Sequence, residues 1–334
     1  MSARDTGFSL LELTIALGLT LVLTTTIFTV MQPAHGASVM QPEAADMQQR
    51  VRVAVDTLTR DLMMAGAGAY VSGHTGPLSG AFAPVLPFRR GAVGSDPAEA
   101  FKSDTITLIY VPTTAAQTTL AADFVPASLT MQVAPCAGCP AGVNLCSFSA
   151  GMTVLAYNTA GAFQTLTVAA VVDAVSQLTT TAPPSTIFRT GTPVVEAQVH
   201  TYYLKADAAA RAFQLIQSDG SANADVPVLD HVVGLTFDYY GDPVLPGGVT
   251  PVTAAELTDG PWRPDGASPD RWDVDLLRIR TVGVTVRVEA ALAVLRGPAG
   301  LLFTNGGTAR AANRWIPDEE IRFRVSPRNL NSRR

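Results

Sequence analysis

Three cysteines lie close together in the middle of the chain, at Cys136, Cys139 and Cys146. A structural zinc site needs four ligands, and neither a histidine nor a fourth cysteine lies nearby. A redox-active Cys-x-x-Cys pair belongs at a helix start in a βαβ unit, and that context is absent. We therefore predict a disulfide that closes a loop in an oxidising compartment. It joins Cys146 to either Cys136 or Cys139, because the tight Cys136–Cys139 loop would be more strained.

Four aspartates surround Trp272: Asp265, Asp270, Asp273 and Asp275. Carboxylate oxygens suit Ca²⁺, but the spacing of these four residues is not that of an EF-hand. We expect a solvated acidic loop here, with a calcium site as the alternative, and we predict no metal site and no cofactor.

Catalytic signatures are missing from the sequence. The sequence has four histidines that form no close ligand pair: His35, His74, His200 and His231. His200 and His231 fall in predicted strands, where we interpret them as packed or surface residues. No Gly-x-Ser-x-Gly, Walker-type or Gly-x-Gly-x-x-Gly segment occurs. We therefore expect a protein that is not an enzyme and has no catalytic residues.

One more residue could do chemistry, the carboxylate Glu12 inside an apolar run. Residues 8–31 contain no other ionisable side chain. As a helix they would rise about 36 Å at roughly 1.5 Å per residue, which exceeds a hydrocarbon core of about 30 Å. The length predicts a transmembrane helix. A carboxylate in such a helix is costly unless it is paired, protonated or near the interface, so it indicates a function.

The residues before this helix indicate which function. Residues 1–7, Met-Ser-Ala-Arg-Asp-Thr-Gly, form a short polar segment, and Phe8-Ser9-Leu10-Leu11-Glu12 follows Gly7 directly. This pattern resembles the class III leader of type IV pilins and type II secretion pseudopilins. The resemblance implies that a prepilin peptidase cleaves between Gly7 and Phe8 and that the new Phe8 amine is methylated. Glu12 would then pair with a Phe8 amine, its own or a neighbouring subunit's, which offsets the desolvation of both charges.

Two other interpretations of the N-terminus remain open. An ordinary secretory signal peptide could be cleaved near Ala34-His35-Gly36, but its apolar region is usually only about 7–15 residues long. A plain single-pass anchor would give Glu12 no purpose.

The elements that follow predict an α+β fold, with a long N-terminal helix packed on an antiparallel β-sheet domain. Pro33 and Pro42 predict a hinge over residues 32–42. An amphipathic helix is expected over 43–68, because Val51, Val55, Leu58 and Leu62 form one apolar stripe, and Gly66 and Gly68 end it. Residues 69–103 are expected to be an irregular connection, and 104–334 a β-rich head domain.

Alternating apolar residues predict the strands of that domain. They fall at 105–111, 129–133, 152–158, 163–172, 194–204 with 212–217 as a hairpin, 229–240, 274–295 and 320–325.

Weaker motifs extend the resemblance over most of the chain. Leu58-Thr59-Arg60-Asp61-Leu62-Met63-Met64-Ala65-Gly66 is similar to a stretch of PilW-like minor pilins. The C-terminal half resembles PilW-like or J-type minor pilins at residues 228–240, Trp272, 277–288 and 323–329. The resemblance implies a structural minor pilin of a type IV pilus, held in the inner membrane by one span with a periplasmic C-terminal domain, then moved to the pilus and cell surface. Its implied partners are other pilins, the prepilin peptidase, the inner membrane and the inner-membrane assembly platform.

Two alternatives to this function remain. One is a J-type minor pseudopilin of a type II secretion system, and the other is a membrane-anchored periplasmic binding protein or hydrolase. The net charge of −5 and the lack of a basic block argue against nucleic acid as a main partner.

Overall fold

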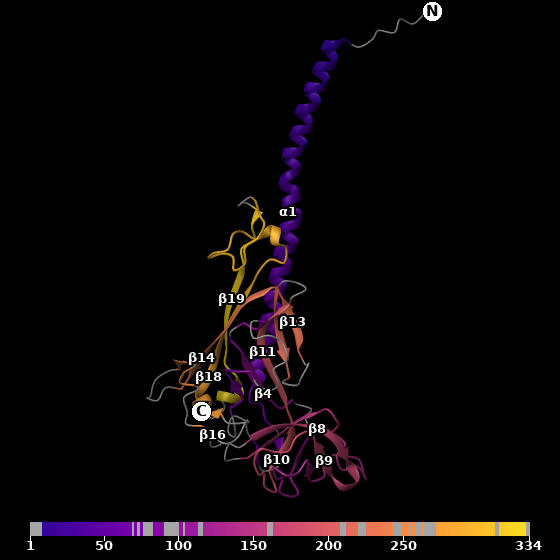
Figure 1. The fold of residues 1–334 in the computed structure, drawn as a ribbon, viewed down its shortest axis with the longest axis vertical. Helices are drawn as coiled ribbons and strands as arrows, with labels where there is room; N and C mark the ends of the chain where they lie inside the picture. The colour runs from indigo at the N-terminus through magenta and orange to yellow at the C-terminus, as the bar shows by residue number, and fades with distance from the viewer. Residues whose placement is uncertain are drawn as a thin grey trace, which may run out of the picture. The chain divides into compact units, whose positions relative to one another are not determined.

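The structure is a computed structural model, and its described residues are 9–68, 70–71, 74–75, 83–89, 100–102, 104–112, 116–158, 163–207, 212–219, 225–242, 249–253, 255–257, 262–263, 272–310 and 314–331. The chain divides into two compact units. The helical unit comprises Met1–Gln49 and Glu289–Glu319, and the β unit comprises Arg50–Val288 and Glu320–Arg334. An apolar N-terminal helix followed by antiparallel sheets places the chain in the α+β class (Figure 1).

Helix α1 runs without interruption from Leu10 to Met64, over 55 residues. The predicted hinge at 32–42 is therefore wrong. Pro33 and Pro42 each remove one backbone donor and crowd the preceding turn, but the helix is formed on both sides of each proline and does not have to be nucleated again.

The C-terminal end of α1 is fixed by a glycine. Gly66 adopts a left-handed φ of 73°, which an L side chain rarely adopts, and a Cβ there would lie 3.1 Å from Pro84 Cγ. Its N–H donates to the carbonyl of Ile109 at 3.0 Å. The glycine thus turns the chain out of the helix, as the sequence predicted.

In the helical unit, residues 289–319 pack on α1 (Figure 1). Met47 is buried with Ala290 and Leu295, and Glu43 accepts a hydrogen bond from the N–H of Ala291. The short 3-10 helix Ala293–Leu295 lies in this segment. The sequence predicted only strand here up to residue 295, so this packing was missed.

The larger core of the β unit is formed by the end of α1 together with a five-stranded and a four-stranded antiparallel sheet. The order of the five-stranded sheet is β13 (Val226–Asp230), β12 (Ala212–Ser218), β11 (Gln198–Asp207), β4 (Ile106–Tyr110) and β3 (Val85–Leu86). Val51, Leu58 and Leu62 are buried and Val55 is partly buried, which confirms the predicted apolar stripe.

A six-stranded sheet is formed by residues that lie between β4 and β11 in the sequence. Its order is β5 (Gln117–Thr119), β10 (Pro193–Glu196), β7 (Thr153–Tyr157), β8 (Phe163–Val172), β9 (Gln177–Thr180) and β6 (Thr130–Gln132). It has a second core, which includes Phe124, Met131 and Phe188. The residues that flank this lobe, Tyr110 and Gln198, are register partners across β4 and β11.

The third sheet has the order β15 (Thr250–Val252), β14 (Val232–Gly241), β18 (Ile279–Val288) and β19 (Glu319–Val325). Two short pairs complete the described strands: β1 (Tyr70–Val71) with β2 (His74–Thr75), and β16 (Trp262–Arg263) with β17 (Trp272–Asp273). A last short helix, α2, spans Arg328–Asn331.

Several predicted strands differ from the observed ones. The 229–240 segment is two strands, because His231 takes a positive φ of 55° and ends β13 before β14 begins. The 194–204 segment is likewise split between β10 and β11, which belong to different sheets. Residues 274–278 are a 3-10 helix rather than strand. The supposedly irregular connection 69–103 contains β1, β2 and β3, and β3 pairs with β4.

Candidate functional site

The first part of α1 is covered by no other part of the described chain. Leu10–Thr29 has a mean hydropathy of 1.9 and no buried residue, and it is the one helix in the described residues that is long and apolar enough to cross a membrane. Its threonines leave no hydroxyl unpaired, because each donates to a carbonyl about one turn earlier: Thr14, Thr20, Thr24, Thr25, Thr26 and Thr29. This helix therefore suits lipid or a bundle of similar helices.

Glu12 lies in the first turn of α1 and is exposed. Its N–H donates to the hydroxyl of Ser9 at 3.2 Å, so Ser9 caps the helix and Glu12 occupies the third helical position. Ser-x-x-Glu is the capping-box pattern, and an acid is favoured at the positive end of the helix dipole. The structure thus supplies a second, purely local reason for a carboxylate at this position. Gly7 and Phe8 lie outside the described residues.

A buried acid lies at the other end of α1. The side chain of Asp61 is only 2% exposed. Its Oδ2 accepts a hydrogen bond from the hydroxyl of Tyr202 at 2.6 Å and contacts Nδ1 of His200. The hydroxyl of Tyr110 lies 3.4 Å from the same histidine nitrogen. Arg60, at 3.4 Å from Oδ1, completes the Asp61 cluster.

The strand register explains why these groups meet. His200 and Tyr202 are two residues apart on β11, so both point to the same face of the sheet. Their partners across β4 are Leu108 and Ile106, and Tyr110 continues that face of β4. This face of the sheet therefore places the rings of His200 and Tyr202 against the carboxylate of Asp61, and the ring of Tyr110 beside His200.

The charge of Asp61 is stabilised in the fold. Burial raises the pKa of Asp61, but the hydrogen bonds from His200 and Tyr202 outweigh burial and leave the pKa below its usual value. Burial and the nearby Asp61 charge raise the pKa of Tyr110 to about 12. The pKa of Tyr202 is also raised, by burial first and then by Asp61. All three shifts favour an ionised aspartate held by neutral phenols, which is a structural cross-link between helix and sheet.

Sequence reasoning missed the Asp61 cluster, although two signals were available. Asp61 follows Leu58 by three residues and Ala54 by seven, so it lies at the edge of the buried stripe of α1. His200 and Tyr202 share one strand face. The sequence left His200 as either a packed or a surface residue; in the structure its side chain is 18% exposed and contacts Asp61.

The structure pairs Cys139 with Cys146, one of the two pairings left open by the sequence. The two Cα atoms are 5.6 Å apart, and Cys136 is the free cysteine. The closed loop is held to the turn at Asp173, whose Oδ1 accepts from the N–H groups of Asn144 and Leu145 at 2.9 and 2.7 Å.

The thiol content tests this pairing. Without a reductant, we expect alkylation of at most one cysteine per folded chain, Cys136. The reaction should be slow at neutral pH, because burial and the Asp173 charge raise the pKa of the Cys136 thiol and reduce its thiolate form. Peptide mass spectrometry after alkylation, with Cys136→Ser as the control that loses the label, gives the measurement. Labelling of Cys139 or Cys146 in unreduced protein would contradict the pairing.

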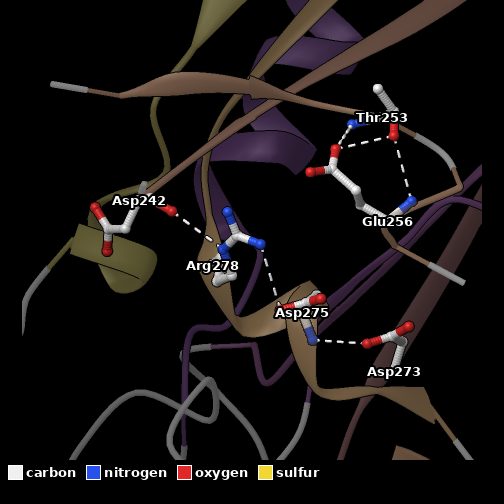
Figure 2. Close-up of polar contacts among 6 residues, drawn as sticks. All are labelled: Asp242, Thr253, Glu256, Asp273, Asp275 and Arg278. Atoms are coloured by element: carbon white, nitrogen blue, oxygen red, sulfur yellow. Dashed lines mark hydrogen bonds and ion pairs between the residues drawn. The ribbon is translucent and has the colours of Figure 1, made fainter. Parts of the chain in front are cut away.

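Two of the acidic residues near Trp272, Asp273 and Asp275, make contacts within the chain (Figure 2). Asp273 is buried and accepts from the N–H of Asp275 at 2.8 Å. Asp275 lies 3.4 Å from Arg278, whose Nε donates to the carbonyl of Asp242 at 3.1 Å. The expectation of a solvated loop is therefore wrong for Asp273.

A neighbouring pair in the same view is also self-contained. Glu256 accepts from both the N–H and the hydroxyl of Thr253, at 2.7 and 2.9 Å (Figure 2). Among the described residues no three His, Cys, Asp or Glu side chains form a metal-binding group. Asp265 and Asp270 lie outside the residues that the structure describes, as do the side chains of His35 and His74.

Comparisons with known proteins add no family. No protein-family model, no curated protein and no solved structure matches the chain.

Proposed function

We propose that the protein is a structural minor pilin of a type IV pilus, processed by a prepilin peptidase and assembled into the pilus or its tip complex. One observation carries the proposal: a Gly-Phe-Ser-Leu-Leu-Glu sequence opens an apolar helix that the protein's own fold leaves uncovered. In the membrane, lipid covers this helix. In a filament, the equivalent helices of neighbouring subunits would cover it.

Two features of the fold support this proposal. The helix that begins with the apolar span also contributes Val51, Leu58 and Leu62 to the core of the β unit. The Asp61 cluster ties the last turns of that helix to β11 through a buried carboxylate. A subunit held in a filament by its N-terminal helix needs such a connection to its outer domain.

N-terminal processing tests the proposal directly. We expect the mature chain to begin at Phe8 and to carry a methylated amine, because Gly7 precedes an aromatic residue and Glu12 follows four residues later. Mass spectrometry of the N-terminal peptide from membrane-derived protein gives the result. A chain that begins at Met1, or after residues 34–36, would contradict the pilin assignment, and Gly7→Leu in the same host should block the cleavage if the assignment is correct.

The type II secretion alternative predicts the same processing. The two machines are distinguished by the phenotype of a strain that lacks this protein: loss of surface filaments supports the pilus, and loss of enzyme secretion with normal filaments supports the pseudopilus.

A further inference from the structure

A tight turn in the helical unit presents two leucines to solvent. Gly300 and Phe303 exchange both of their backbone hydrogen bonds, at 2.9 and 3.3 Å, which places Leu301 and Leu302 at the tip. Leu301 is 92% exposed and Leu302 is 55% exposed, whereas Phe303 is 3% exposed. Leu292 and Val294 of the same segment are also exposed. Two adjacent large apolar side chains held exposed at the tip of a turn, such as Leu301 and Leu302, indicate a contact surface.

The turn is supported from below by fixed contacts. The ring of Phe303 meets that of Trp315 edge to face at 5.7 Å between centroids. The N–H of Asp318 donates to the carbonyl of Leu302 at 3.0 Å, and its carboxylate accepts from the N–H of Thr304 at 2.7 Å. The exposure of the leucines is therefore built into an anchored turn.

In the same segment, two acidic side chains are buried or bonded to the turn, whereas the exposed charges are positive. Glu289 is fully buried and lies 3.2 Å from Arg296, and Asp318 caps the turn. The exposed charged side chains among described residues 289–310 and 314–319 are Arg310 and Arg314. A segment that exposes an apolar tip, and whose exposed charges are arginines, matches the surface of a bilayer with anionic headgroups.

The length of α1 allows this contact. Glu43, which accepts from the N–H of Ala291, follows the end of the candidate span at Thr29 by a helical rise of about 21 Å at roughly 1.5 Å per residue. A headgroup layer of roughly 6 Å reduces the gap. The remaining gap of about 15 Å is less than half of the roughly 33 Å that a fully extended chain from Ala291 to Leu301 would measure. The folded segment, which includes the 3-10 helix Ala293–Leu295, therefore needs less than half of its full extension to bring the tip to the membrane surface.

We propose that the Leu301–Leu302 turn is a second membrane contact, which inserts into the interface of an anionic bilayer beside the helix that spans it. The proposal rests on α1 spanning a membrane and does not require assembly into a filament. The turn would hold the helical unit in one orientation at the membrane surface.

Spin labels on the full chain test the proposal. In a Cys136→Ser background with the disulfide oxidised, single cysteines are introduced as Leu301→Cys, Leu17→Cys within the span and Leu129→Cys, an exposed apolar site of the β unit. The protein is reconstituted in vesicles of phosphatidylethanolamine with phosphatidylglycerol, and collision rates with oxygen and a water-soluble nickel chelate are measured. We expect the ratio of the oxygen collision rate to the nickel collision rate to be severalfold higher at position 301 than at position 129. The double substitution Arg310→Gln with Arg314→Gln should reduce the ratio at position 301, and so should vesicles of pure phosphatidylcholine.

Each other outcome overturns the proposal in a different way. An equal ratio at positions 301 and 129, with position 17 in lipid, means that the turn stays in water. Low collision rates with both reagents at 301 mean that another protein chain covers the turn. An aqueous ratio at position 17 means that the helix does not span the bilayer, and the premise fails with the proposal.

Discussion

Replacement of Asp61 by alanine is expected to lower the free energy of unfolding of the β unit by about 3 kcal/mol, because it leaves buried donors without an acceptor. Tyr202 is fully buried, and its hydroxyl donates to Asp61 at 2.6 Å. His200 loses the same partner. Chemical denaturation of the full chain in mild detergent, followed by tyrosine and tryptophan fluorescence, measures the loss.

The same helix offers a matched control. Asp56 is an exposed residue on α1, so Asp56→Ala makes the same chemical change at the surface. We expect its effect to stay within about 0.5 kcal/mol. Asp61→Asn should be intermediate, because the amide oxygen still accepts one hydrogen bond. If Asp61→Ala and Asp56→Ala unfold at the same denaturant concentration, Asp61 does not connect the helix to the sheet.

The pH dependence of this loss has a definite sign. The folded pKa of Asp61 lies below its usual value, so the folded state favours the ionised carboxylate. The stability contributed by the charge is fully present above the ordinary aspartate pKa of about 3.9 and is lost as the pH falls through the lower folded value. The difference between wild type and Asp61→Asn should therefore be constant near neutrality and shrink below about pH 4.

Replacement of Glu12 by alanine is expected to weaken association with partner pilins by about a hundredfold or more, since an amine left buried without its acid costs about 3–5 kcal/mol. Membrane insertion should persist, because the substitution removes a charged side chain from the apolar helix. Processing after Gly7 should also persist, because the cleaved bond is unchanged. Co-purification with partner pilins, at equal membrane abundance, provides the measurement.

Glutamine at position 12 separates the two roles that the structure allows for Glu12. Gln serves as well as Glu as the acceptor in a capping box, so Glu12→Gln keeps that capacity but removes the charge. The hydrogen bond from the backbone N–H of position 12 to Ser9 is available to either variant. If the charge pairs with an amine, assembly of Glu12→Gln should fall between wild type and alanine. If Glu12→Gln assembles like wild type and Glu12→Ala does not, the role of Glu12 is helix capping. Wild-type assembly by alanine would refute charge pairing.

The sequence allowed prediction of the elements whose signals are local. The apolar run, the stripe at Val51, Leu58 and Leu62, and the left-handed end at Gly66 all follow from residue type and spacing. The strand at Phe163–Val172 was predicted with its observed limits. These features depend on neighbours within a few residues in the chain.

The remaining features depend on contacts between residues that are far apart in sequence. The Asp61 cluster joins residues separated by about 140 positions, and no local pattern shows which strand will lie against the helix. The course of α1 through Pro33 and Pro42 shows the limit of a local rule, because two missing donors did not end a long helix. The choice between Cys136 and Cys139 likewise depended on how the loop docks on Asp173.

The six-stranded lobe leaves the five-stranded sheet and returns to it at one point. Tyr110 and Gln198 face each other across β4 and β11, at the spacing of an ordinary hairpin. The lobe is thus an insertion between two paired strands. Its length or sequence can change without altering the register of β4 and β11. The lobe has a core of its own around Phe124, Met131 and Phe188, while Leu155, Phe163 and Val195 on its strands belong to the main core. A lineage could therefore vary this outer surface while the helix and the sheet beneath it stay the same.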